Sequence, residues 1–131
     1  MITLNINTSA RCQLADITRD VENRLAAHGL SDGIVVVYTP HTTSAITINE
    51  NADPDVQTDM NAFLSKLIPV SRDFRHSEGN SDSHIKASLV GASETVIVEK
   101  GRLILGTWQG IYFCEFDGPR NRKVYLKFIG S

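Results

Sequence analysis

Two polar segments carry most of the side chains that could bind a metal or a phosphate. Residues 75–87, RHSEGNSDSHIKA, hold two histidines, a glutamate, an aspartate, an asparagine and a lysine around one glycine. This segment has too few apolar residues to be fixed by core contacts of its own. Another histidine, His41, follows an apolar run in TPHTTSAITINENADPD. We therefore predict that folding brings His41, His76 and His84 together.

Three neutral imidazoles with an open fourth position are a common arrangement around a catalytic divalent metal. The spacing of His41, His76 and His84 matches no helical metal motif, so only tertiary structure could bring them together. An imidazole-rich set favours zinc, whereas magnesium prefers oxygen ligands, and the predicted cofactor is a divalent metal ion, zinc or magnesium. A structural role stays open, with His41 hydrogen-bonded to Thr42 or Thr43 and His84 in the first turn of a short helix.

Four carboxylates lie within ten residues in the middle of the chain. Asp53 and Asp55 have a structural role available, because carboxylates are favoured in the first turn of a helix. Glu50 has no such role, since it follows an alternating strand and precedes Asn51-Ala52. Glu50 is therefore the preferred carboxylate for metal binding or general-base chemistry.

A basic pair follows the turn at residues 117–119. On an extended segment Arg120 and Arg122 point the same way, and two guanidinium groups suit phosphate or pyrophosphate oxygens. A solvated hairpin tip is the commoner outcome for a basic turn. Binding of a small phosphorylated metabolite remains an expectation for this pair.

The only tryptophan lies between two glycines, in Gly106-Thr-Trp-Gln-Gly110. The glycines indicate a bulge or a close backbone approach. Trp108 is either a core residue or a stacking wall for a ring-shaped ligand, and the core is the preferred interpretation.

Length and composition predict one globular domain, residues 1–131. The formal net charge of −2 argues against a partner nucleic acid, which needs a basic field. No apolar run reaches the ~20 residues of a membrane span, and the N-terminus lacks the pattern of a signal peptide, so we expect no membrane and a cytoplasmic location. In that compartment Cys12 and Cys114 are expected to be free thiols.

The pattern of apolar residues predicts an alternation of strands and helices in the first half. Residues 2–7 alternate as a strand with one buried face, and an apolar period of three to four from Leu14 predicts a helix ending near Gly29. Residues 33–39 read as a central strand buried on both faces, followed by a strand at 44–49. Asp53 and Pro54 begin a helix that ends near Ile68.

The second half begins with a long polar connection over residues 70–82, which favours a functional loop. A short helix over 84–90, capped by Ser81 or Asp82, leads into strands at 94–99, 103–105, 109–116 and 124–129. This order predicts an α+β fold with mostly antiparallel sheets or a sandwich and helices packed on one side.

Three long blocks resemble one known family. HTTSAITINENADPD, RHSEGNSDSHIKASLVG and GRLILGTWQGIYFCEFDGPRNRKV are similar to the YjbQ-like family, described as secondary thiamine-phosphate synthases. The resemblance runs from about Val35 to the C-terminus. It implies an α+β fold assembled as a homotrimer, with a metal and histidines near the subunit interfaces. It also implies a weak transferase activity that couples a pyrimidine pyrophosphate to a thiazole phosphate and releases pyrophosphate.

The family's motifs fall on residues of this chain that the patterns above also select. The resemblance implies a metal on His41, His76 and His84. Catalytic groups would be Glu50, Asp82 and Asn80. Groups that bind substrate or phosphate would be Thr43, Trp108, Gln109, Arg120 and Arg122. Two alternatives stay open, which are binding of a phosphorylated metabolite or metal without turnover, and metal-dependent hydrolysis of a small phosphorylated compound.

Overall fold

The computed structural model describes residues 1–130 of the chain. Their elements, in chain order, are β1 (Ile2–Asn7), β2 (Gln13–Asp16), α1 (Thr18–His28), β3 (Gly33–Tyr38), β4 (Ser44–Glu50), α2 (Pro54–Leu67), α3 (Ser81–Val90), β5 (Ser93–Glu99), β6 (Arg102–Leu103), β7 (Gln109–Glu115) and β8 (Asn121–Gly130).

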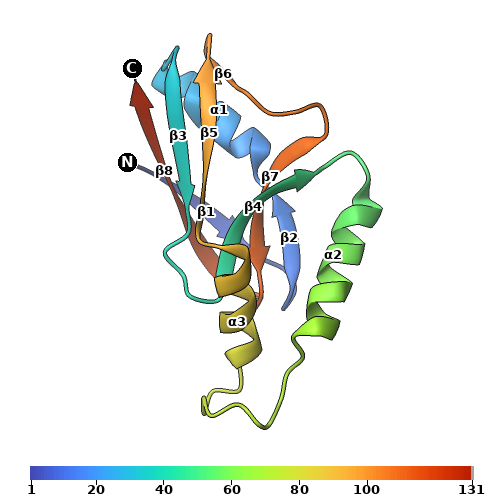
Figure 1. Cartoon of the computed structure of the whole chain (residues 1–131). Helices are drawn as coiled ribbons and strands as arrows, with labels where there is room; N and C mark the ends of the chain where they lie inside the picture. The colour runs from blue at the N-terminus through green and yellow to red at the C-terminus, as the bar shows by residue number, and fades with distance from the viewer. Residues whose placement is uncertain (131) are drawn as a thin grey trace.

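The strands form two antiparallel sheets (Figure 1). The larger sheet has the order β1-β8-β3-β5-β6 and the smaller one the order β2-β7-β4. Every strand pair within residues 1–130 is antiparallel. The predicted α+β fold with mostly antiparallel sheets is therefore confirmed.

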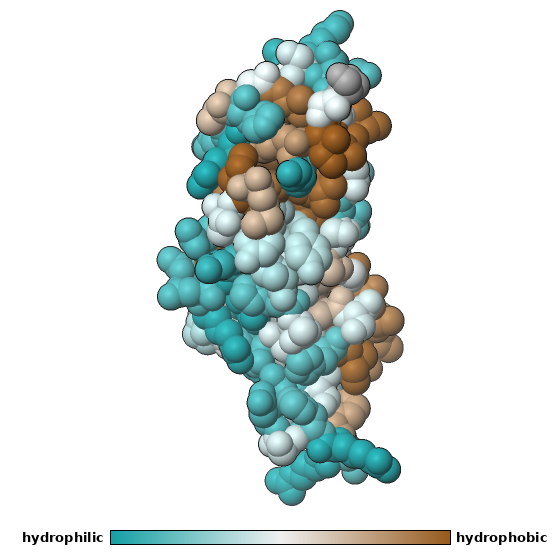
Figure 2. Space-filling model, turned by 90° about the vertical axis from the view of Figure 1, so that its left-hand side faces the viewer, coloured by the Kyte–Doolittle hydropathy of each residue, from teal (hydrophilic) through white to brown (hydrophobic). Residues whose placement is uncertain are grey.

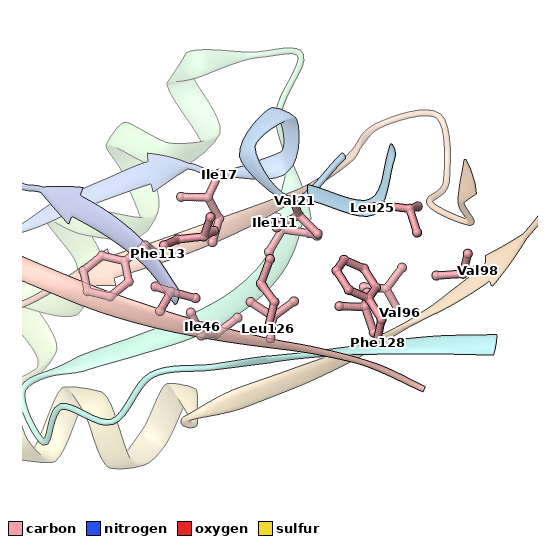
Figure 3. Close-up of a cluster of buried hydrophobic side chains, with 14 residues drawn as sticks. Ile17, Val21, Leu25, Ile46, Val96, Val98, Ile111, Phe113, Leu126 and Phe128 are labelled. Atoms are coloured by element: carbon pink, nitrogen blue, oxygen red, sulfur yellow. The ribbon is translucent and has the colours of Figure 1, made fainter. Parts of the chain in front are cut away.

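Both sheets and α1 contribute to one hydrophobic core (Figure 3). Val21 and Leu25 of α1 are one helical turn apart, and both point into this core. Alternate residues of β8, such as Val124 and Leu126, meet them from the larger sheet, and Phe113 of β7 does so from the smaller one. Alternate residues of the strands and residues one helical turn apart in α1 thus point into the same core.

The opposite face of the smaller sheet packs against α3 and, more loosely, α2. Ala45, Tyr112 and Cys114 of this sheet form a second cluster with Ala87 of α3. Helix α2 has no fully buried residue, and Phe63 on it is 63% exposed. Helix α2 thus carries a stripe of apolar side chains, Val56, Met60, Phe63, Leu64 and Leu67, that this single chain covers only in part.

The outer face of the larger sheet carries exposed apolar side chains. Tyr38, Ile97 and Ile129 are all exposed, and Tyr38 stacks on Tyr125 with ring centroids 6.4 Å apart. Figure 2 shows brown, hydrophobic side chains gathered over the upper half of this side of the molecule. The prediction that β3 is buried on both faces is wrong, because only Val35 and Val37 are buried.

The predicted first helix begins too early. Leu14 belongs to β2, which pairs with β7, and α1 starts only at Thr18. Pairing of β2 with the distant strand β7 overrides the helical spacing of the apolar residues around Leu14. At the start of α1, the Asp16 carboxylate accepts a hydrogen bond from Thr18 N at 2.9 Å. The other end is as predicted, since Gly29 follows α1 in the left-handed conformation.

The other predicted boundaries are closer to the structure. Asp53 caps α2, where its carboxylate accepts a hydrogen bond from Asp55 N at 2.9 Å. Helix α3 begins at Ser81, and the residue before it, Asn80, makes no side-chain capping bond. The predicted cap by Ser81 or Asp82 is therefore wrong. Both cysteines are free, as predicted. None of the helices within residues 1–130 has the length and apolarity needed to span a bilayer.

Candidate functional site

Three segments that are distant in sequence line one polar cavity of about 300 Å³. They are the connection between β3 and β4, the approach to α3, and the turn between β7 and β8. The lining residues are Pro40, His41, Thr42, Thr43, Glu78, Asn80, His84, Asp117, Arg120 and Arg122.

Arg122 is the most rigidly held cation of this cavity. It is 3% exposed, and its guanidinium donates hydrogen bonds to both oxygens of Glu115, including Nε to Oε1 at 2.9 Å. Its Nη2 also donates to Thr43 Oγ1 at 2.8 Å. Burial pushes the pKa of Glu115 up, but the hydrogen bonds from Arg122 and Thr8 outweigh it and hold that pKa below its usual value. The pair is therefore charged at neutral pH, with Arg122 fixed in place at the cavity wall.

Arg120 is held less tightly than Arg122. Its Nη2 donates to Asp117 Oδ2 and its Nε to the Asp117 carbonyl oxygen, both at 2.8 Å. The same Oδ2 accepts a hydrogen bond from Asn80 Nδ2 at 2.8 Å. Arg120 is exposed, so a ligand in the cavity can reach its guanidinium.

His41 is oriented by the backbone of β8. Its Nε2 accepts a hydrogen bond from Lys123 N at 2.9 Å, so a neutral ring carries its proton on Nδ1. Burial and the nearby Arg122 charge lower the pKa of His41, which favours this neutral form. The ring therefore offers a ligand one N–H donor.

His84 lies between two cavities. It lines the polar cavity described above and a neighbouring one of about 420 Å³, which it shares with His41, Pro40 and Thr42. Tyr38 and Ala87 are among the other residues of this second cavity. The two spaces thus meet at the histidines.

The third predicted histidine packs against the second. The rings of His76 and His84 lie edge to face with centroids 5.4 Å apart, and His76 Nε2 is 3.6 Å from a Glu78 carboxylate oxygen. His84 therefore contacts His76 and shares two cavities with His41, whereas His76 itself does not line them.

The chain is similar over its full length to one family of proteins. Residues 2–131 match the family model described as UPF0047 protein YjbQ-like. The chain belongs to this family. It is 57% identical to the UPF0047 protein YugU of Bacillus subtilis over 129 residues, which cover 98% of each chain. A UPF0047 protein of Methanocaldococcus jannaschii is 56% identical over 126 residues, with 96% of this chain and 91% of the relative covered.

Solved structures of relatives have the same fold. A crystal structure of a YjbQ/UPF0047 family protein from Clostridium acetobutylicum has a TM-score of 0.96 and 55% identity, covering 98% of this chain and 100% of that one. A YbjQ-like protein of unknown function from Sulfolobus solfataricus has a TM-score of 0.94 at 30% identity, covering 99% and 96%. These descriptions name the family and no activity.

A metal site made of three histidines is not preformed in this YjbQ-like chain. Within residues 1–130 no three His, Cys, Asp or Glu side chains are arranged to hold one metal ion. The lone pair of neutral His41 already accepts the Lys123 N–H. The donor set of His41, His76 and His84 therefore does not fit a metal in this conformation, and the predicted site stays a prediction.

Asp82 is held in ion pairs with Arg11 and Lys86. It is buried, and its two oxygens accept hydrogen bonds from Arg11 at 3.0 and 3.1 Å. Lys86 Nζ lies 3.6 Å from the same carboxylate. Burial alone would raise the pKa of Asp82, but the hydrogen bonds and charge of Arg11 lower it. Asp82 does not line the polar cavity, unlike Asn80, which does.

Three other predicted site residues lie at the far end of the smaller sheet. Glu50 ends β4 and pairs in register with Gln109 of β7, while Trp108 O accepts a hydrogen bond from Asn51 N at 2.8 Å. The seven residues of β4 place Glu50 roughly 20 Å from Ser44 beside the cavity. The Glu50 carboxylate instead accepts a hydrogen bond from Ala52 N at 2.8 Å. A single chain thus does not bring these three residues to the histidines.

Trp108 is 63% exposed, so the preferred interpretation as a core residue is wrong. Its side chain does not reach either core cluster of residues 1–130.

Sequence reasoning missed Glu115 and Asp117. A signal for Glu115 was available, because it shares the inward parity of Ile111 and Phe113 on β7. Arg122 likewise shares the parity of the buried residues of β8. Opposite charges at two core-facing positions predict a buried ion pair. Asp117 offered no comparable signal, since an aspartate before glycine is ordinary turn chemistry.

Proposed function

We propose that the polar cavity binds the phosphate group of a small phosphorylated metabolite. The observation that carries this proposal is the convergence of Arg120, Arg122, His41 and His84 on one cavity. Arginine guanidinium groups are suited to phosphate oxygens in charge and in geometry. Thr43 adds a hydroxyl group to the same lining.

The neighbouring cavity supports a ligand with an organic part. It adjoins the phosphate site at His41 and His84, and Tyr38 and Ala87 contribute to its lining. A ligand that spans both spaces would place its phosphate near the arginines and its less polar part near Tyr38.

Calorimetric titration with inorganic phosphate tests the proposal. Arg120→Gln is the informative variant, because Arg120 is exposed and its loss leaves the buried Arg122 pair intact. Loss of charge-assisted hydrogen bonds worth about 1.5–3 kcal/mol should weaken phosphate binding about 10- to 100-fold. Arg102→Gln, an exposed arginine on β6, is the matched control and should bind as the wild type does. Equal affinity in Arg120→Gln and the wild type would contradict the proposal.

The finer proposal for this site is a thiamine-phosphate synthase-type transfer. A C–N bond would form between a thiazole phosphate and a pyrimidine as the C–O bond to pyrophosphate breaks. Arg120 and Arg122 would stabilise the charge that develops on the departing oxygens. Formation of thiamine phosphate from the two substrates, lost in Arg120→Gln and kept in Arg102→Gln, is the expected result. If phosphate binds but neither variant nor wild type forms product, the role is binding without turnover. If a panel of small phosphorylated compounds releases phosphate, the activity is hydrolysis.

We also propose that the chain assembles as a homotrimer. The apolar outer face of the larger sheet and the uncovered stripe of α2 support association, since exposed apolar patches of this kind mark interaction surfaces (Figure 2). In this trimer, Glu50, Trp108 and Gln109 of one subunit would lie beside the polar cavity of a neighbouring subunit, which they do not approach within their own chain.

A further inference from the structure

We infer that Asp117 makes the polar cavity selective for a phosphate group that carries a proton. The inference rests on the proposed phosphate site and names the form of phosphate that this site accepts. A protonated phosphate oxygen would donate a hydrogen bond to Asp117 Oδ1, while the other phosphate oxygens accept hydrogen bonds from Arg120 and Arg122. Sulfate, which has the same shape but no proton to donate, would be rejected.

One carboxylate oxygen of Asp117 is left open beside the arginines. Its Oδ2 accepts hydrogen bonds from Asn80 Nδ2 and Arg120 Nη2, both at 2.8 Å. Its Oδ1 accepts none from the residues that the structure describes, and it is not enclosed. Asp117 lines the polar cavity together with Arg120 and Arg122. A ligand in the cavity therefore meets a hydrogen-bond acceptor next to two guanidinium groups.

The Asp117 carboxylate is held in its place by several bonds. Besides the two hydrogen bonds to Oδ2, Asp117 N donates to Glu115 Oε2 at 3.2 Å. The Asp117 carbonyl oxygen accepts a hydrogen bond from Arg120 Nε at 2.8 Å. Moving the carboxylate away from a bound anion would break bonds of this set. The anion must therefore accommodate the carboxylate.

The charges around the cavity disfavour an anion that can only accept hydrogen bonds. Arg122 is paired with Glu115 and Arg120 with Asp117, while Glu78 adds another carboxylate to the lining. The three carboxylates thus outnumber the two arginines. An ionised carboxylate has no donor and repels the oxygens of sulfate. A P–OH group converts the same contact into a charge-assisted hydrogen bond.

The discrimination should be large for so small a difference between two ligands. A site that is built to hydrogen-bond a ligand's O–H strongly rejects the analogue that lacks it, because the polar group of the site is then left unpaired. A hydrogen bond to a charged group corresponds to roughly 10- to 100-fold in affinity. Repulsion between Asp117 Oδ1 and a sulfate oxygen would add to this preference.

The first test compares inorganic phosphate with sulfate by calorimetry at about pH 8. There most of the phosphate is HPO₄²⁻, which equals sulfate in charge and shape but keeps one proton. We expect the wild type to bind phosphate at least about tenfold more tightly than sulfate. Asp117→Asn removes the negative charge and adds an amide donor, so sulfate affinity should rise to about that of phosphate. Asp20→Asn, an exposed position on α1, is the matched control and should keep the preference of the wild type.

The second test counts protons with methyl phosphate as the ligand. A phosphate monoester has a second pKa of about 6, so at pH 7.5 it is mostly unprotonated and must take up a proton when it binds. Titration in two buffers of different ionisation enthalpy measures this uptake. We expect about one proton per ligand in the wild type and almost none in Asp117→Asn.

The other titratable groups that face the ligand are Glu78, His41 and His84. Proton uptake that persists in Asp117→Asn would assign the proton to one of these groups and would overturn the inference. A wild type that binds sulfate as tightly as phosphate would also overturn it, and the proposed function would then stand. If neither phosphate nor sulfate binds, the proposed function itself fails.

Discussion

At the level of single residues, His41 is the group whose chemistry the structure defines most sharply. Its Nε2 accepts the Lys123 N–H, and burial together with Arg122 lowers its pKa. Both effects keep the ring neutral, with Nδ1–H as the group that can donate to a bound phosphate oxygen. A metal could take His41 as a ligand only after the bond to Lys123 breaks.

The lowered pKa of His41 makes stability depend on pH. The folded chain favours the neutral form of His41, because the pKa of this ring is lower in the folded than in the unfolded chain. The resulting contribution to stability is complete above pH 6.5, the ordinary pKa of histidine. It is lost as the pH falls below 6.5 toward the pKa of the folded chain. Urea unfolding at pH 7.5 and 5.5 should therefore show the wild type losing stability relative to His41→Gln at the lower pH. An unchanged difference between the two proteins at both pH values would contradict this expectation.

The sequence identified most residues of the polar cavity but not how they are paired. His41, His84 and the two arginines were selected by residue type and by their positions at the ends of predicted elements. Their partners were missed for two reasons: the inward position of Glu115 on β7 was a signal that was not used, and Asp117 lies in the turn after β7, where an aspartate before glycine is ordinary. Glu50 was selected on local grounds, and the length of β4 carries it away from the cavity.

At the level of elements, the position of α3 decides the shape of the site. The helix carries His84 and begins just after Asn80, and its first turn is tied to the β1–β2 connection by the Arg11–Asp82 pair. Ser83 Oγ donates to Phe116 O at 2.6 Å and ties the same turn to the end of β7. These contacts replace the capping bond that α3 lacks.

Removing the Asp82 carboxylate should therefore loosen α3. Asp82→Ala leaves the buried ammonium group of Lys86 without a carboxylate, a change that costs about 3–5 kcal/mol in buried ion pairs. Arg11→Ala should cost less, roughly 1 kcal/mol, because the Arg11 side chain is partly exposed and screened by solvent. Urea unfolding measures both values, and hydrogen exchange should report faster exchange in α3 of Asp82→Ala. Equal losses in the two variants would show that Asp82 acts only through Arg11.

Most elements follow from local patterns, and the exceptions have one cause. The ends of α1 and α2 were predicted by Gly29 and Asp53, which act within one helical turn. Leu14 was misassigned because β2 is a short strand whose existence depends on pairing with β7, almost one hundred residues later in the chain. The spacing of apolar residues around Leu14 and their local strand propensity contain no information about that partner strand.

At the level of the whole molecule, two antiparallel sheets share a core and leave one broad face uncovered. The exposed side chains of this face include Ile97 on β5 and Ile129 on β8, the two strands that flank β3 in the larger sheet (Figures 1 and 2). Apolar side chains on the open face of a sheet are stabilised when a second surface covers them. This feature connects the fold with the proposed trimer.

Ile97→Asp tests that connection. Ile97 is 56% exposed, so a charge there should leave the fold of one chain intact while it disfavours burial of the face. Light scattering after size exclusion should give three times the 14.4 kDa of one chain for the wild type, and about the mass of a single chain for Ile97→Asp. Leu89→Asp, an exposed residue of α3, is the control and should keep the mass of the wild type. A trimer that persists in Ile97→Asp, with an unchanged circular dichroism spectrum, would exclude this face as the interface.

The location of Trp108 has a practical consequence for optical experiments. This single indole is open to water at the end of the smaller sheet opposite the cavity, so its emission should be red-shifted in an isolated chain. In an isolated chain, filling the cavity would leave that fluorescence almost unchanged, whereas contact of another molecule with the distant edge would shift it toward the blue. The chain therefore carries an intrinsic optical reporter for association.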